Sequence, residues 1–347
     1  MVVFGLQGFL TDWCCDLTAA LIGSQGRPPE IAKLNSIEDF AVQLLANPAD
    51  LIVRSTWPDP ILLNAVRRAG TACVFAHDQP LRSAYFRMPR FGEGYLNAIR
   101  GVMAESVALR GVTMPDVVHV RREEVVADPV AEIARIARAL GLRDLGEKAG
   151  MLHQHCKPAF SYLEQSPAEM IGQSEEGAPK PVVSSQERAV LEAALGRLGT
   201  FGEEDQTRLL LTKDFFNFEG APIGDGRIDA TGRARLLVQG PHIFLAAGAW
   251  KARSVHRFSS DLAGSPFTID AVSWVGTTPH DLARTTFTVP SSGGVVETLL
   301  NFAVTNPQGM IEMRLFADRA VFGGEISLGY VDVTRNHLRD PILDTVA

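Results

Sequence analysis

The sequence predicts an α/β domain, with a parallel sheet covered by helices on both faces, followed by an all-β antiparallel sandwich. In the first half, short apolar runs rich in β-branched residues alternate with segments of helical periodicity. After about residue 205, short alternating segments are separated by Gly, Pro, Asn and Asp. The 347 residues are 46% hydrophobic and 21% charged, an ordinary globular composition at a length typical of roughly two domains. We therefore expect one domain over residues 1–204 and a second over residues 205–347.

Four apolar runs of the first half are expected to be strands, and each is followed by a helical pattern. Apolar strands that alternate with helices are typical of a parallel sheet buried on both faces. The strands are VVFGL (2–6), DLIVRS (50–55), ACVFAH (72–77) and DVVHVR (116–121). The helices are expected near 14–21 and 61–68, from about 81, and at 95–111, 128–142 and from Ser184 or Ser185.

Charge and cysteine content exclude several classes of function. The net charge of −7 and a pI near 5.7 argue against a nucleic-acid partner and against binding to an anionic membrane. The four cysteines lie in apolar segments and form no disulfide framework, which fits a reducing compartment. No apolar run approaches the length of a membrane span, and the N-terminus has no positively charged leader. These features predict a cytoplasmic protein without a membrane span.

The loop after the first apolar run is the first candidate site. A strand that leads into a helix N-terminus often binds a phosphate, because free backbone N–H groups point at the anion. Gly8 and Thr11 could hold a phosphate in this way, but Thr11 or Asp12 as an ordinary helix N-cap is the simpler interpretation. Arg54, at the end of the next predicted strand, is either a phosphate ligand or an ion-pair partner.

Two histidine segments also invite a chemical interpretation. His77 and Asp78 form either an acid–base pair or a turn in which Asp78 caps the next helix, and the cap is favoured. The HQHC segment (153–156) has side chains two residues apart, which point in different directions on a helix. We therefore expect no metal site.

The segment VVHVRREEVVADPVAEIARIARALGL (117–142) resembles the part of the sulfotransferase family in which a strand is followed by an acidic turn, Asp-Pro and a helix ending in Leu-Gly-Leu. LIVRSTWP (51–58) and CVFAHDQPLRSAYFRM (73–88) resemble two further motifs of that family in the same order. The resemblance covers residues 1 to about 205. It implies a P-loop-like α/β fold and sulfuryl transfer from 3′-phosphoadenylyl sulfate.

The resemblance also implies roles for individual residues. Arg54, Thr56 and His77 fall at the positions of reactive groups. The loop residues Gly8, Thr11, Asp12 and Trp13 would surround the phosphosulfate, and Arg82 and Ser83 would lie near the 3′-phosphate. The chain departs from the family because this loop has no Lys or Arg and contains an aspartate. Whether the protein is an active enzyme therefore stays open.

The second half resembles a carbohydrate-binding-like sandwich module fused to bacterial enzymes of surface-polysaccharide assembly. The resemblance is carried by LVQGPHIFLAAGAWKARSVHRF (237–258), in which a Gly-Pro-His turn is expected before an apolar strand, and by MRLFADRAVFGGEISLGYVDVTR (313–335). Sugars are held by aromatic faces backed by polar groups. His242, Trp250 and Trp274 are the candidates, although aromatic residues in a sandwich more often lie in the core.

Two functions follow from the sequence. The first is a sulfotransferase-like protein that transfers a sulfuryl group to a hydroxyl of a glycan or surface polysaccharide. The second is a catalytically inactive sulfotransferase-like scaffold whose sandwich binds a glycan or a protein. A glycan is the expected partner, and a homo-oligomer is left open.

Overall fold

The computed structural model describes residues 1–23, 29–46, 51–110, 112, 114, 116–142, 148–170, 183–196 and 208–336. The chain divides into two compact units, Met1–Ser184 with Gly199–Glu204 and Ser185–Leu198 with Asp205–Ala347. Helix α12 (Ser185–Leu195) therefore groups with the second unit although it precedes residue 205.

The first unit is built on a five-stranded sheet in the order β2-β3-β1-β4-β5. All neighbouring strands in it are parallel. The strands are β1 (Val2–Gly5), β2 (Glu30–Lys33), β3 (Leu51–Ser55), β4 (Cys73–His77) and β5 (Val117–Arg121). Strand β2 was missed in the sequence because only Ala32 of its four residues is buried, so it carries no apolar run.

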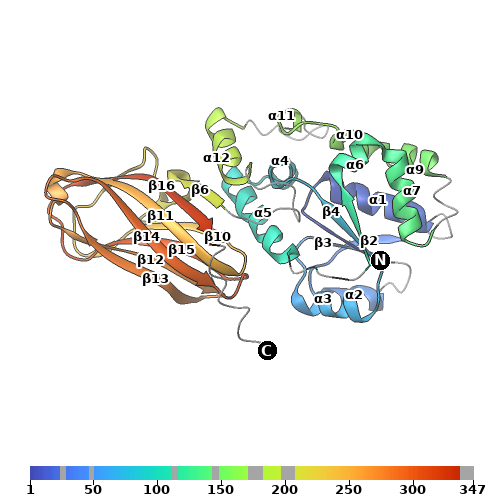
Figure 1. The fold of residues 1–347 in the computed structure, drawn as a ribbon, viewed down its shortest axis with the longest axis horizontal. Helices are drawn as coiled ribbons and strands as arrows, with labels where there is room; N and C mark the ends of the chain where they lie inside the picture. Colours follow the sequence, from blue (N-terminus) through green and yellow to red (C-terminus); the bar gives the residue numbers. More distant parts are fainter. Residues whose placement is uncertain are drawn as a thin grey trace. The chain divides into compact units, whose positions relative to one another are not determined.

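Helices cover both faces of this sheet (Figure 1). They are α1 (Phe9–Gly23), α2 (Ile37–Ala46), α3 (Pro60–Arg68), α4 (Pro80–Phe91), α5 (Tyr95–Leu109), α6 (Arg122–Ala127), α7 (Pro129–Ala139), α9 (Ala149–His155), α10 (Lys157–Leu163) and α11 (Pro167–Met170). Val3 faces a core formed with α1, α7 and α9, whereas Val2 and Phe4 face a core formed with α3. This alternation along β1 separates the two cores, because successive strand side chains point to opposite faces.

Local sequence signals explain where several helices begin. Asp59 and Asp128 accept hydrogen bonds from Leu62 N (2.5 Å) and Ala131 N (2.9 Å), and each precedes a proline in the first turn. The N-cap expected at Thr11 or Asp12 is wrong. Helix α1 already begins at Phe9, because Asp12 N donates to Gly8 O (3.1 Å), so both residues lie inside the helix.

The second unit contains two antiparallel sheets, in the orders β13-β12-β15-β10-β7-β8 and β14-β11-β16-β6, with β9 paired to β16. Its strands are β6 (Arg208–Thr212), β7 (Asn217–Phe218), β8 (Ala221–Pro222), β9 (Arg227–Asp229), β10 (Arg235–Phe244), β11 (Gly248–Phe258), β12 (Pro266–Val275), β13 (Thr278–Thr288), β14 (Gly294–Val304), β15 (Met310–Ala317) and β16 (Glu325–Arg335). The predicted fold class, an α/β unit followed by an antiparallel sandwich, is confirmed.

One detail of the sandwich differs from the prediction. Gly240, Pro241 and His242 form no turn before a strand but lie inside β10, where the register with β15 shifts between Pro241 and Ile243. This irregularity re-aims the His242 side chain, as β-bulges commonly do. Among the helices of the described residues, none combines the length and the apolarity needed to cross a membrane.

Candidate functional site

The loop Leu6–Gly8 follows β1 at the point where the connections of the sheet diverge. From β1 the chain runs to β2 on one side, and from the neighbouring β4 it runs to β5 on the other. Ligands of open α/β sheets bind in the crevice at the carboxyl ends of such strands. Topology therefore makes this loop the first place to look for a site in the first unit.

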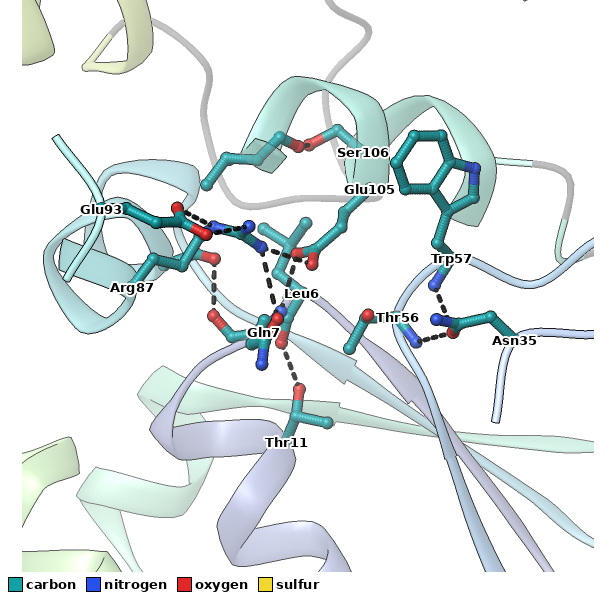
Figure 2. Close-up of polar contacts among 12 residues, drawn as sticks. Leu6, Gln7, Thr11, Asn35, Thr56, Trp57, Arg87, Glu93, Glu105 and Ser106 are labelled. Carbon is teal, nitrogen blue, oxygen red and sulfur yellow. Dashed lines mark hydrogen bonds and ion pairs between the residues drawn. The ribbon is translucent and has the colours of Figure 1, made fainter. Parts of the chain in front are cut away.

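The loop is held by side chains of the chain itself (Figure 2). The Thr11 hydroxyl donates to Leu6 O and the Ser83 hydroxyl donates to Gln7 O, each at 2.6 Å. The backbone N–H of Gln7 donates to Oε2 of Glu105, on α5, at 2.9 Å. A buried carboxylate therefore takes the kind of backbone donor that an anionic ligand would take.

Glu105 is bound from several directions. Arg87, on α4, contacts Oε1 of Glu105 through Nη1 at 2.7 Å, and the Thr56 hydroxyl also hydrogen-bonds the carboxylate. Glu105 is only 4% exposed. Burial raises the pKa of Glu105 above its ordinary value, while Arg87 and the Gln7 amide act in the opposite direction. The Glu105 carboxylate thus joins the loop after β1 to Arg87 on α4 and to Thr56.

Three cations gather around the loop, and two of them, Arg54 and Arg87, form ion pairs with acidic residues. Arg54 forms an ion pair with Asp12, and Arg87 binds Glu93 as well as Glu105. Lys33 donates to the side-chain oxygen of Gln7 at 3.3 Å. Burial and then the nearby Arg54 lower the pKa of Lys33 below its ordinary value. The cations are therefore close enough to repel one another, and the acidic groups compensate for that repulsion.

Thr11 and Trp13, expected around the phosphosulfate, and Thr56, expected among the reactive groups, make internal contacts. Thr11 is fully buried and bonds the loop, and Thr56 is 2% exposed beside Glu105. Trp13 is fully buried in the core on the α1 face of the sheet. A Cβ built on Gly8 would lie 3.6 Å from Oδ2 of Asp78, so a further carboxylate borders the loop.

Internal contacts also bind the remaining candidates, which are His77, Arg82 and Ser83. His77 is 6% exposed and its Nε2 lies 2.7 Å from Nδ1 of His119 on β5. Arg82 is 2% exposed, donates to Tyr162 O (3.1 Å) and Gln165 O, and pairs with Asp78 (3.3 Å). Its guanidinium thus connects the turn after β4 to the last turn of α10 and to the segment after it.

These residues do not fit 3′-phosphoadenylyl sulfate in the manner that the resemblance implies. The Gln7 amide binds Glu105, the Arg82 guanidinium binds carbonyls and Asp78, and Asp12 adds negative charge on α1. An incoming phosphosulfate would meet carboxylates where it needs N–H donors.

The sequence reasoning missed Lys33, Arg87 and Glu105, although these residues form the centre of the site. Lys33 lies on β2, the strand that the sequence did not predict. Arg87 and Glu105 lie on α4 and α5, which the sequence predicted only as helices that cover the sheet. One signal was present. Gly101 precedes Glu105 by one helical turn, and a Cβ at Gly101 would lie 2.5 Å from Nη2 of Arg87. A glycine and a glutamate four residues apart mark the helix face that accommodates the guanidinium.

In the sandwich, the outer face of β12 and β15 carries a second candidate site. Ile311, Met313 and Leu315 of β15 are buried in the core, so the alternating residues Glu312, Arg314 and Phe316 lie on the opposite face of the strand. On that face Glu312 is only 4% exposed, whereas Arg314 and Phe316 are partly exposed. Trp274 Nε1 donates to Oε2 of Glu312 at 2.5 Å, and His242 Nε2 lies 3.2 Å from Oε1. Burial alone would raise the pKa of Glu312, but the hydrogen bonds from His242 and Trp274 lower it below its ordinary value.

The same face continues along β15 with an ordered cation. Arg314 binds Asp270 with two hydrogen bonds of 2.9 and 2.8 Å, and its guanidinium lies 5.3 Å from the centre of the Phe316 ring. Trp274 and Phe316 are both partly exposed. Trp274 pairs with Met310, and Phe316 lies six residues farther along β15. At the rise per residue of a strand, the two rings are thus about 20 Å apart along the strand, with the polar groups of Glu312, Arg314 and Asp270 between them.

The structure brings two of the three sugar-contact candidates together. His242 and Trp274 share Glu312, whereas Trp250 is 1% exposed and donates through Nε1 to Ala246 O at 2.8 Å. Alternation along β11 points Trp250 into the sandwich core, so it offers no face to a ligand. We therefore remove Trp250 from the candidates and add Glu312, Arg314 and Phe316.

Comparisons with known proteins show similarity of low extent. No protein-family model and no curated protein matches the chain. The chain is similar to the structure of mouse sulfotransferase SULT7A1 complexed with PAP, with 13% identity and a TM-score of 0.35, over 45% of this chain and 62% of that one. It thus spans under two thirds of that sulfotransferase.

Carbohydrate-binding modules are also among the similar structures. TmCBM61 in complex with β-1,4-galactotriose has 9% identity and a TM-score of 0.25, over 38% of this chain and 83% of that one. A CBM4 structure has 11% identity and a TM-score of 0.25, over 35% of this chain and 100% of that one. At these TM-scores the matches carry no argument of their own, and the functional case depends on the residues described above.

Proposed function

We propose that the protein binds a glycan through the outer face of β12 and β15, and that its α/β unit is a sulfotransferase-like scaffold that performs no sulfuryl transfer. The observation that carries the glycan proposal is the cluster in which Glu312 fixes both Trp274 and His242. A ring held by its N–H keeps an apolar face ready for a sugar and loses little entropy on binding.

The neighbouring groups support a sugar rather than an apolar ligand. Buried Glu312 holds Trp274 and His242 in place. The partly exposed Arg314 guanidinium, oriented by Asp270, can donate to sugar hydroxyls. Phe316 is a second, partly exposed ring farther along β15, and the guanidinium groups of Arg314 and Arg284 lie over it at 5.3 and 6.0 Å. Polar groups between two aromatic rings are an arrangement that suits an oligosaccharide chain.

A second candidate, sulfuryl transfer to a glycan, is favoured by one observation. Lys33, Arg54 and Arg87 converge on the loop after β1, and within the described residues Nε and Nη2 of Arg54 are buried without a hydrogen-bond partner. The contacts of Glu105 oppose this candidate, because they occupy the loop amide.

Glycan binding is tested with the full chain on an array of neutral oligosaccharides, followed by titration calorimetry with β-1,4-galactotriose and with the best array hit. We expect Trp274→Ala to weaken binding at least about tenfold, as expected for loss of an aromatic anchor. Trp57→Ala is the matched control, because Trp57 is a 38% exposed tryptophan of the α/β unit, and it is expected to bind like the wild type. If no array glycan binds the wild type, or if both variants lose affinity equally, the glycan proposal is wrong.

The scaffold proposal is tested separately by titrating the wild type with adenosine 3′,5′-bisphosphate. We expect no saturable heat at high micromolar ligand. Saturable binding would contradict the scaffold proposal and favour the transferase.

A further inference from the structure

We propose that the carboxylate of Glu105 is an internal anion that occupies an oxyanion-binding site, and that removing it opens the site to a small oxyanion such as sulfate or phosphate. This inference goes beyond the proposed glycan binding and does not depend on it. It concerns what the α/β unit could bind once its own side chain no longer fills the site.

The donors around Glu105 are those that bind free oxyanions. They are a backbone N–H from a loop at a helix N-terminus (Gln7), a guanidinium (Arg87) and a hydroxyl (Thr56). Figure 2 shows the Glu105 carboxylate pointing to both Arg87 and the loop at Gln7. A carboxylate and one edge of a sulfate present similar pairs of acceptor oxygens, so the same donors can serve either anion.

The surrounding charges favour an anion at this position. Lys33 and Arg87 both contact the Gln7 side chain. Both cations also lie over the Phe91 ring, at 5.7 Å for Lys33 and 5.9 Å for Arg87. Without the charge of Glu105, these two cations would share the acidic groups Glu93 and Asp12 with Arg54. An incoming anion would restore the lost compensation.

The site is also expected to survive the loss of Glu105. Arg87 keeps a bidentate contact with Glu93, at 3.0 and 2.8 Å, so its guanidinium stays paired. Gly101 leaves room for that guanidinium against α5. The loop keeps its contacts with Thr11 and Ser83. The backbone N–H of Thr56 donates to Asn35 Oδ1 at 3.2 Å. Arg87, the loop and the backbone of Thr56 are thus positioned by contacts that Glu105 does not make.

The test is a titration of Glu105→Ala with sodium sulfate at constant ionic strength, monitored by calorimetry and by the midpoint of thermal unfolding. We expect Glu105→Ala to bind sulfate at least about tenfold more tightly than the wild type, because charge-assisted hydrogen bonds become available to it. Glu93→Ala is the matched control, because it also removes a carboxylate from Arg87 but leaves Glu105 on the Gln7 amide. We expect it to behave like the wild type, and the double variant Glu105→Ala/Arg87→Met to lose the gained affinity.

Sulfate stabilises proteins generally by exclusion from their surface, so the gain is counted relative to the wild type and Glu93→Ala in the same salt. If Glu105→Ala does not fold in chloride, its refolding yield in sulfate and in chloride at equal ionic strength is the readout. Equal sulfate responses of Glu105→Ala, Glu93→Ala and wild type overturn the inference. That failure is distinct from the scaffold proposal, which depends on adenosine 3′,5′-bisphosphate and the unmodified protein.

Discussion

His256 makes the stability of the sandwich depend on pH. The residue lies on β11, is 2% exposed, and within the described residues neither of its ring nitrogens has a hydrogen-bond partner. Burial lowers its pKa from 6.5 to about 4. The unfolded chain therefore binds a proton at a pH where the folded sandwich does not. The stability associated with neutral His256 is complete above pH 6.5 and is lost as the pH falls toward 4.

The magnitude follows from the two pKa values. Lowering the pKa of His256 from 6.5 to about 4 reduces the free energy of unfolding by about 3 kcal/mol when the pH is well below both values. Between about pH 7.5 and about pH 5, the free energy of unfolding falls by about 2 kcal/mol. Ser254 and Thr298 lie nearby on β11 and β14, and in the described part of the chain their hydroxyls also have no partner. Among the residues that the structure describes, no carboxylate contributes to the pKa of His256, so burial sets the direction.

The assay is hydrogen exchange of the most protected amides of β11 and β14 at the two pH values, corrected for intrinsic exchange, because these amides report unfolding of this unit. His256→Phe removes the titration and is expected to remove about 2 kcal/mol of the pH dependence, whatever its effect at neutral pH. His280→Gln, at an exposed position on β13, is the control and should keep the wild-type dependence. An unchanged pH dependence in His256→Phe would refute the reasoning.

Two further predictions concern stability. Arg82→Met should destabilise the α/β unit by about 3 kcal/mol, because it leaves Asp78 buried without its cation and removes the donor to two backbone carbonyls. Urea unfolding measures this loss of stability. A loss below about 1 kcal/mol would show that the Arg82–Asp78 pair is dispensable. Gly240→Ala should destabilise the sandwich by about 2 kcal/mol or more, because φ is 144° and a Cβ would lie 2.3 Å from Phe215 O; a wild-type thermal midpoint for this variant would contradict the geometry.

Much of the fold was predictable because its signals are local. The apolar runs at 51–55 and 73–77 are mostly or fully buried, and the run at 117–121 has Val118 and Val120 buried between more exposed residues. Asp128 with Pro129 fixes the start of α7. The short strand β2 was not predictable in this way. Its pairing with β3, rather than its own sequence, makes it part of the sheet.

The sites were predictable only in part. The position of the loop after β1 followed from the strand-to-helix pattern, and Trp274 was a candidate from its residue type. The occupant of the loop was not predictable, because Glu105 is 98 residues from Gln7 in the chain and no local pattern connects them. Trp250 and Trp274 look alike in the sequence, and their roles differ because alternation along two strands points one inward and leaves the other beside Glu312.

The sequence by itself determined the order of the two units, the places where strands meet helices, and a loop after β1 that lacks lysine and arginine. Periodicity, capping and composition act over a few residues, so a single chain can reveal them. Only the tertiary structure decided that the loop amide binds Glu105, that Arg87 and Lys33 supply cations from elsewhere in the chain, and that His242 and Trp274 share one carboxylate. Such contacts join residues far apart in the chain, and the packing of helices and sheets fixes them.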